Sequence, residues 1–277
     1  MKWLNFILSH SIFISICAFA LCMQSFQLLH IPVNYPIPAL VFFATLGSYN
    51  FYWLISKYYF ATKTGLLTFL RNNAMNVVFL LLASVGILFC FFTERHMLPE
   101  ILVSVGLTLL YSVPLWPGSR PAYFKKAGFV KTVLLAFTWT YVTVVIPAGE
   151  GIWIHTTPAL LLFTARFLFM LMLCIIFDSR DAAIDKMRSL HSLATAVTRK
   201  TLGIIMALVF ACYVVTGFVL RYFFDDRPQL VAFLLTGIIV LLVYRLSLKK
   251  QDYVFYYFWV DGLMLISALA TYIAAVF

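Results

Sequence analysis

Three aspartates at the end of an apolar stretch are the residues of this sequence best suited to chemistry. Asp178, Asp181 and Asp185 lie in the segment FDSRDAAIDKMRSLHSL, which begins at Phe177 after about twenty mostly apolar residues. On a helix that turns about 100° per residue, this spacing places all three within about 60° of one face. Carboxylates this close repel one another, and oxygen-only ligands select hard cations such as Mg²⁺. The spacing therefore predicts a magnesium site.

A second interpretation of the same cluster stays open at this point. Neighbouring cations could also relieve the repulsion in surface ion pairs at a solvated helix end; the candidates are Arg180, Lys186 and Arg188. Spacing alone does not separate the two interpretations.

The composition requires an integral membrane protein. Of the 277 residues 64% are hydrophobic and only 11% are charged, whereas a soluble domain carries about 25% charged residues. The net charge of +10 would suit nucleic-acid binding, but the cations lie between hydrophobic segments. We therefore expect membrane lipids around the chain and no nucleic-acid partner, and no obligate protein partner is evident.

Nine segments are long and apolar enough to span a bilayer, which takes about 20 residues. We expect one all-α transmembrane domain over 1–277 with helices at about 5–29, 36–57, 73–93, 97–115, 129–148, 157–177, 202–222, 228–246 and 254–276.

Loop charge predicts the orientation of these spans. With the N-terminus inside, sixteen Lys and Arg fall on inner segments and three on outer ones, and Arg166 lies within a span. Cationic loops stay on the cytoplasmic side. We therefore expect a protein of the inner or plasma membrane with a cytoplasmic N-terminus, an external C-terminus and the Asp cluster facing the cytoplasm.

The segment DSRDAAIDKMRSLHSLA resembles the second aspartate motif of the UbiA superfamily of intramembrane prenyltransferases. That motif reads roughly D-x-x-D-x-x-x-D-[KR]-x-x-G-x-x-T-L. The three aspartates, Lys186 and Leu193 match it in place, while Ser189 stands at the Gly position and Ser192 at the Thr position. The family also has nine helices, with this motif in the cytosolic loop after the sixth. The resemblance thus implies a UbiA-like bundle.

The resemblance further implies transfer of an isoprenyl group from a prenyl diphosphate to a small aromatic or lipid acceptor. Asp178, Asp181 and Asp185 would hold Mg²⁺ and serve as the catalytic carboxylates. Diphosphate would contact a set of cations, namely Lys57, Arg120, Lys125, Lys126 and Lys186, and Asn50 would help to orient it.

The first family motif, N-D-x-x-D-x-x-x-D, is degenerate here. Asn50 is in place, but Phe51, Leu54 and Tyr58 occupy the aspartate positions. Several hypotheses follow. The enzyme could work with one Mg²⁺, with Lys57, Lys63 or Arg71 supplying the remaining positive charge. The protein could bind a prenyl phosphate or lipid without catalysis, or transport a small molecule. The Asp cluster could also be structural.

Two further ionisable residues lie inside predicted spans, where single charges are costly. Arg166 and Asp261 are at similar predicted depths. We expect them to form an ion pair or to share a polar pocket.

Overall fold

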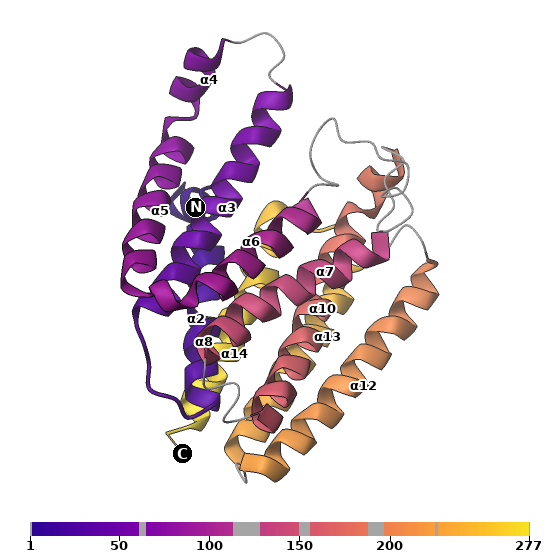
Figure 1. The fold of residues 1–277 in the computed structure, drawn as a ribbon. Helices are drawn as coiled ribbons and strands as arrows, with labels where there is room; N and C mark the ends of the chain where they lie inside the picture. The colour runs from indigo at the N-terminus through magenta and orange to yellow at the C-terminus, as the bar shows by residue number, and fades with distance from the viewer. Residues whose placement is uncertain are drawn as a thin grey trace.

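The computed structural model describes residues 2–60, 65–112, 128–149, 156–187, 197–224 and 227–276. At some helix ends, including 59–60 and 181–187, it describes only the backbone. Every element in these ranges is helical (Figure 1). In chain order they are α1 (Lys2–Ser9), α2 (Ile12–Leu28), α3 (Pro36–Phe60), α4 (Leu66–Asn72), α5 (Ala74–Thr93), the 3-10 turn η1 (Arg95–Met97), α6 (Leu98–Ser112), α7 (Gly128–Thr140), the π-helix η4 (Tyr141–Val145), α8 (Ile146–Ala148), α10 (Thr156–Met187), α12 (Arg199–Phe224), α13 (Arg227–Ser247), the π-helix η5 (Phe255–Val260) and α14 (Asp261–Ala274).

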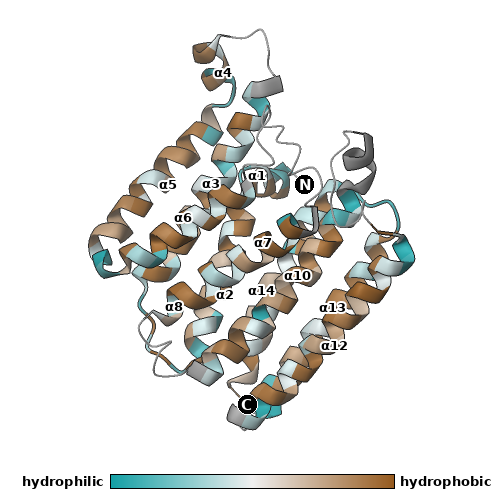
Figure 2. Ribbon diagram, turned by 45° about the vertical axis from the view of Figure 1, so that its right-hand side comes forward, coloured by the Kyte–Doolittle hydropathy of each residue, from teal (hydrophilic) through white to brown (hydrophobic). Residues whose placement is uncertain are grey.

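Seven helices of the described chain are long and apolar enough to cross a membrane, and the bent pair α1 and α2 would make an eighth. The predicted span at 97–115 corresponds to α6, which is described over 15 residues, Leu98–Ser112. Figure 2 shows hydrophobic residues along the helices and hydrophilic ones gathered mainly at their ends. The chain is thus a polytopic membrane protein, and nine spans remain a prediction.

The centre of the bundle is α10, which packs against α7, α12 and α13. All six residues from Leu171 to Ile176 are buried, so this helix is apolar on every side, as an enclosed helix must be. Of the apolar window of α10, 61% is buried, against 17% for α5. Buried residues of α2 and α14 belong to the same core; α2 packs against α3 and α14, and α3 packs against α5.

The first predicted helix, at 5–29, is broken in the structure. The axes of α1 and α2 differ by 66°, and Ser11 between them has a left-handed backbone with φ 61°. The break leaves the His10 carbonyl oxygen available to a side chain, and Asn50 Nδ2 of α3 donates to it at 2.9 Å. A long-range hydrogen bond therefore accompanies this break, which hydropathy could not reveal.

The helix that carries the aspartates is longer than its predicted span at 157–177. It runs without interruption to Met187, so Asp178, Asp181 and Asp185 lie on one helix, as the spacing requires. This end of the bundle, where α3 and α10 end and α7, α12 and η5 begin, is called the Asp178 end below. The C-terminus of the chain lies at the opposite end (Figure 1).

Candidate functional site

Asp178 is held between α10 and α7. Thr132 Oγ1 donates a hydrogen bond to Asp178 Oδ2 at 2.5 Å, and Thr132 is 2% exposed. A hydrogen bond to a carboxylate at this distance is strong and charge-assisted. Asp178 itself is only partly exposed, so its carboxylate is fixed at the edge of the bundle and does not extend freely into solvent.

The other two predicted metal ligands and four of the predicted diphosphate contacts lie outside the described side chains. Asp181, Asp185 and Lys186 belong to the part of α10 described by its backbone alone, and Arg120, Lys125 and Lys126 lie outside the described residues. Among the side chains that are described, no group of three His, Cys, Asp or Glu could hold a metal. The Mg²⁺ site therefore stays a prediction.

The available donor set nevertheless fits one hard cation. Three carboxylates on one continuous helix offer only oxygen ligands, which Mg²⁺ prefers. No carboxylate faces them from α3, because the corresponding positions hold Phe51, Leu54 and Tyr58. A second metal would thus lack its usual ligands on the α3 side.

Arg180 is fixed against aromatic rings two residues after Asp178. Its guanidinium carbon lies 5.1 Å from the ring centroids of Phe177 and Tyr256 and 5.2 Å from that of Tyr257. These are cation–π distances. Tyr253 stacks on Tyr257 at 4.3 Å, and burial, together with Tyr257 and Asp261, raises the pKa of Tyr253 to about 12 despite the nearby Arg180. The rings of η5 therefore hold Arg180 on the side of α10 that faces Asp261.

Asp261 is a buried carboxylate directly beneath this aromatic cluster. It is 6% exposed and begins α14 immediately after the π-helix η5. Arg180 and Tyr49 both lie within electrostatic range of it. Cys174 is influenced by Asp178 as well as by Asp261, and it precedes Asp178 by one helical turn. The two carboxylates thus belong to one region, with Asp261 on the interior side.

An apolar pocket of about 370 Å³ opens next to this region, between α3, α5, α6 and α7 with η4. We call it the α3–α7 pocket. Tyr49 and Trp139 form part of its wall, with ring centroids 6.5 Å apart. Thr138, also in the wall, follows Thr132 by six residues on α7, a rise of about 9 Å. An apolar hollow therefore lies deeper in the bundle than the Thr132–Asp178 hydrogen bond.

Asn50 and Lys57 are connected through a residue that the sequence did not single out. Asn50 is fully buried and donates to the carbonyl oxygens of His10 and Leu46, each at 2.9 Å. Asn76 Nδ2 donates to Asn50 Oδ1 at 2.9 Å, and Lys57 Nζ donates to Asn76 Oδ1 at 3.4 Å. The Asn50 amide is thus occupied within the protein, while exposed Lys57 is available at the helix end. Their predicted roles in binding diphosphate stay predictions.

The expected ion pair between Arg166 and Asp261 is wrong. Arg166 Nη2 instead donates to Gln24 Oε1 at 2.8 Å, and Arg166 Nη1 is buried and has no hydrogen-bond partner among the described residues. Gln24 Nε2 in turn donates to Thr271 Oγ1 at 2.6 Å. The polar path from Arg166 therefore runs towards the C-terminal part of α14 and away from Asp261.

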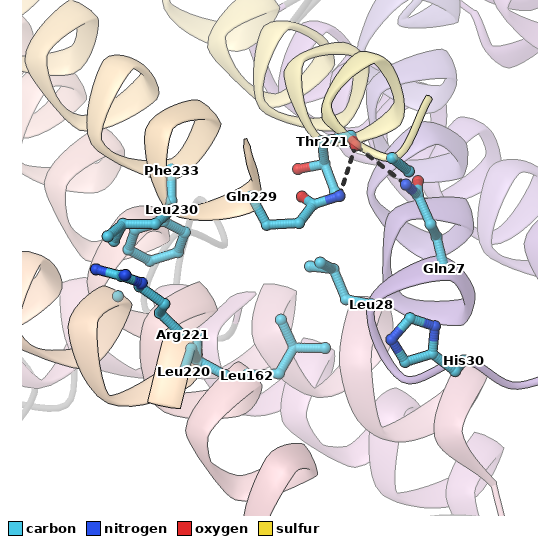
Figure 3. Close-up of a pocket in the computed structure, with 12 residues that line it drawn as sticks. Gln27, Leu28, His30, Leu162, Leu220, Arg221, Gln229, Leu230, Phe233 and Thr271 are labelled. Carbon is cyan, nitrogen blue, oxygen red and sulfur yellow. Dashed lines mark hydrogen bonds between the residues drawn. The ribbon is translucent and has the colours of Figure 1, made fainter. Parts of the chain in front are cut away.

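A second cavity, of about 320 Å³, lies at the end of this polar path. Gln27 and Gln229 both donate to the Thr271 carbonyl oxygen, at 3.0 and 2.9 Å, and Figure 3 shows these amides meeting at one side of the cavity. Arg221 and several leucines form other parts of the wall. This cavity is lined from the C-terminal part of α14, far along that helix from Asp261, and it contains no described carboxylate.

The residues that complete the candidate site were missed because their signals are not local. Thr132, Tyr256 and Asn76 are ordinary helical residues in sequence, and only the packing of their helices reveals their partners. Asp261 was noticed for its depth alone.

Comparison with known proteins supports the fold. No protein-family model matches the sequence, and the search of curated proteins gives no match. A solved structure, from work on the biosynthesis of digeranylgeranylglyceryl phosphate synthase in membranes, aligns with a TM-score of 0.58 over 99% of this chain and 98% of the other. The sequences are 16% identical, so the similarity is one of fold.

Proposed function

We propose that this chain is a UbiA-like membrane prenyltransferase that moves an isoprenyl group from a prenyl diphosphate to a small aromatic or lipid acceptor. The observation that carries the proposal is the α3–α7 pocket, an apolar hollow about two helical turns below the Thr132–Asp178 hydrogen bond. A prenyl diphosphate has the same two parts, an apolar chain and a strongly anionic head. The fold similarity to a digeranylgeranylglyceryl phosphate synthase, whose product name includes two geranylgeranyl groups, agrees with this class of substrate.

The reaction needs the diphosphate to leave with the electron pair of its bond to the allylic carbon. Asp178, Asp181 and Asp185 would hold Mg²⁺, which when bound neutralises the leaving group as a Lewis acid. Lys57 would add a positive charge from α3, where the carboxylates of a second metal site are missing. Arg120, Lys125, Lys126 and Lys186 would contact the distal phosphate, because charged hydrogen bonds to phosphate are strong.

The aromatic residues in the pocket wall suit a reaction in which positive charge develops on the allylic carbon. Tyr49 and Trp139 line the inner wall of the pocket, where their rings would stabilise positive charge on the allylic carbon and exclude water. The acceptor then attacks this carbon and loses a proton. A dry site matters here, because water would compete with the acceptor for the same carbon.

The test is a turnover assay with the purified protein in lipid nanodiscs, labelled prenyl diphosphates and a panel of aromatic and lipid acceptors. We expect Mg²⁺-dependent product from the wild type and at least a 100-fold loss in Asp178→Asn. The amide oxygen of this variant still accepts from Thr132, so the fold is preserved. Asp252→Asn is the matched control, since exposed Asp252 accepts a hydrogen bond from the Phe255 N–H at the start of the last helical segment, and asparagine caps a helix as well.

Two results would contradict the proposal. One is equal product from wild type and Asp178→Asn, which removes the metal-binding role. The other is tight binding of prenyl diphosphate with no product for any acceptor, which indicates a lipid-binding protein instead.

A further inference from the structure

Asp261 is a carboxylate in the interior of the bundle that receives no hydrogen bond from the described residues. It is 6% exposed, and among the described residues it makes no hydrogen bond and no ion pair. Two side-chain atoms in the described chain are fully enclosed and lack a hydrogen-bond partner, Glu100 Oε2 and Arg166 Nη1. The Asp261 oxygens are not among these fully enclosed atoms.

A buried carboxylate without a hydrogen bond lowers the stability of the folded protein, so its presence suggests a functional role. A buried polar group without a hydrogen bond costs free energy, and ionisable residues inside membrane spans are rare and commonly functional. Asp261 also follows a π-helix, an irregularity frequent at functional sites. Its burial, its depth in the membrane and the neighbouring π-helix together indicate that the Asp261 carboxylate accepts a hydrogen bond from a ligand.

The surroundings of Asp261 identify where that ligand would lie. Tyr49, which interacts electrostatically with Asp261, is part of the wall of the α3–α7 pocket. Cys174 lies within range of both Asp261 and Asp178. Asp261 is not itself part of the pocket wall, but it lies within electrostatic range of Tyr49 in that wall and of Cys174, one helical turn before Asp178.

None of the titratable groups around Asp261 supplies it with a hydrogen bond, so the ligand is the expected donor. Its titratable neighbours include Cys17, Tyr49, Cys174 and Tyr253, and none of them donates a hydrogen bond to it in the described structure. Arg180 is the cation in range, and its charge partly offsets that of an ionised Asp261.

We infer that Asp261 is the catalytic base of the proposed transfer and that the acceptor is a hydroxyl-bearing molecule, an alcohol or a phenol. This inference rests on the proposed function. The acceptor O–H donates to the Asp261 carboxylate in the bound state, which a ring C–H cannot do. As the bond from the allylic carbon to diphosphate breaks, the acceptor oxygen supplies the electron pair of the new carbon–oxygen bond. Its proton passes to Asp261, and later to water.

The experiment measures two rates in the same sample, release of diphosphate and formation of prenylated acceptor. Asp261→Asn keeps the size of the side chain but cannot take the proton. We expect transfer to a hydroxyl acceptor to fall by about 100-fold or more, the range for loss of a general base. Release of diphosphate through attack by water should fall less than threefold, because water can give its proton to solvent. Asp252→Asn should leave both rates unchanged.

A matched pair of acceptors tests the assignment of the hydroxyl. The wild type should bind a phenol more tightly than its methyl ether, and Asp261→Asn should bind the two alike. A wild-type transfer rate in Asp261→Asn, or an equal loss of both rates in a variant that melts at the wild-type temperature, would overturn the role of Asp261. Product on a ring carbon would overturn the acceptor class.

The same data separate this inference from the proposed function. Turnover by the wild type that is unaffected in Asp261→Asn rejects the inference alone. Absence of diphosphate release from the wild type with every donor rejects the proposed function, and the inference with it.

Discussion

At the scale of single residues, the hydrogen bond between Thr132 and Asp178 is the contact on which the candidate site depends most directly. It joins α7 to α10 and fixes one carboxylate oxygen. We predict that Thr132→Val, which removes the donor at nearly constant shape, lowers the free energy of unfolding by about 1.5–3 kcal/mol, the range for a hydrogen bond to a charged group. Thermal unfolding in detergent, followed by circular dichroism, measures it. The variant should also need more Mg²⁺ for half-maximal turnover.

Thr140→Val is the control for this prediction. Thr140 is fully buried on the same helix, but its hydroxyl donates only to the Ala136 carbonyl oxygen one turn away. Such local bonds add little to helix stability, so its unfolding free energy should stay close to that of the wild type. Equal stability of the two variants would show that the contact with Asp178 contributes nothing.

The identity of the reactive residues could be predicted, but their partners could not. The aspartate spacing is a property of one helix, so Asp178, Asp181 and Asp185 were found from local sequence. Arg166 and Asp261 were recognised by their cost in a membrane. Their pairing was predicted wrongly because similar depth does not fix the direction in which a side chain points, and Gln24 on a neighbouring helix offers Arg166 a nearer acceptor.

At the scale of elements, close approach of α3 and α5 depends on glycine. A Cβ on Gly86 would lie 2.4 Å from the Phe43 ring, whereas a Cβ on Gly106 would meet nothing within 4 Å. We predict that Gly86→Ala lowers the free energy of unfolding by about 1–3 kcal/mol through overpacking. Gly106→Ala, the matched control, should be neutral or slightly stabilising, since alanine favours helix.

The same unfolding assay includes a rescue. Phe43→Ala removes the ring together with its Cγ, which would also lie 2.4 Å from that Cβ, and should restore part of the lost stability when it is combined with Gly86→Ala. If Gly86→Ala were as stable as Gly106→Ala, the two helices would have to be farther apart than the structure places them. Small residues at such contacts are usual in membranes, where close packing replaces the hydrophobic effect between helices.

Element boundaries followed from hydropathy where the chain is simply apolar, as in α5 and α13. They failed where backbone geometry departs from an ideal helix. The break at Ser11 and the π-helices η4 and η5 lie within apolar sequence, and their hydrogen bonds involve residues far along the chain, such as Asn50 with His10 and Ser25 with the Thr143 carbonyl oxygen. No period in the local sequence encodes these contacts.

At the scale of the whole molecule, the two cavities divide the bundle into unlike regions. The α3–α7 pocket is lined by Tyr49, Thr138 and Trp139 among others, while the cavity around Gln27 and Gln229 lies near the end of α14. Buried residues of α10, among them Met172 and Ile175, occupy the core between helices. Because buried side chains fill the space between the helices, this arrangement is more typical of an enzyme with one reaction centre than of a transporter with a continuous path.

The orientation of this molecule in its membrane is a prediction that follows from charge. Sixteen Lys and Arg lie on the segments predicted to be inner and three on the outer ones, a bias that keeps the former in the cytoplasm. The prediction places Lys249, near the Asp178 end, inside and His96 outside. Both side chains are exposed, so cysteines introduced there can react with a maleimide that does not cross membranes.

Four of the five native cysteines are buried and Cys212 is exposed, so Cys212→Ala provides the background for labelling. We expect His96→Cys to be labelled in intact cells and Lys249→Cys only after permeabilisation. The background chain without either new cysteine controls for reaction of buried thiols. The reverse pattern would put Asp178, Asp181 and Asp185 on the outer face, away from cytoplasmic Mg²⁺ and prenyl diphosphates, and the proposed reaction would lose its substrate supply even with the site intact.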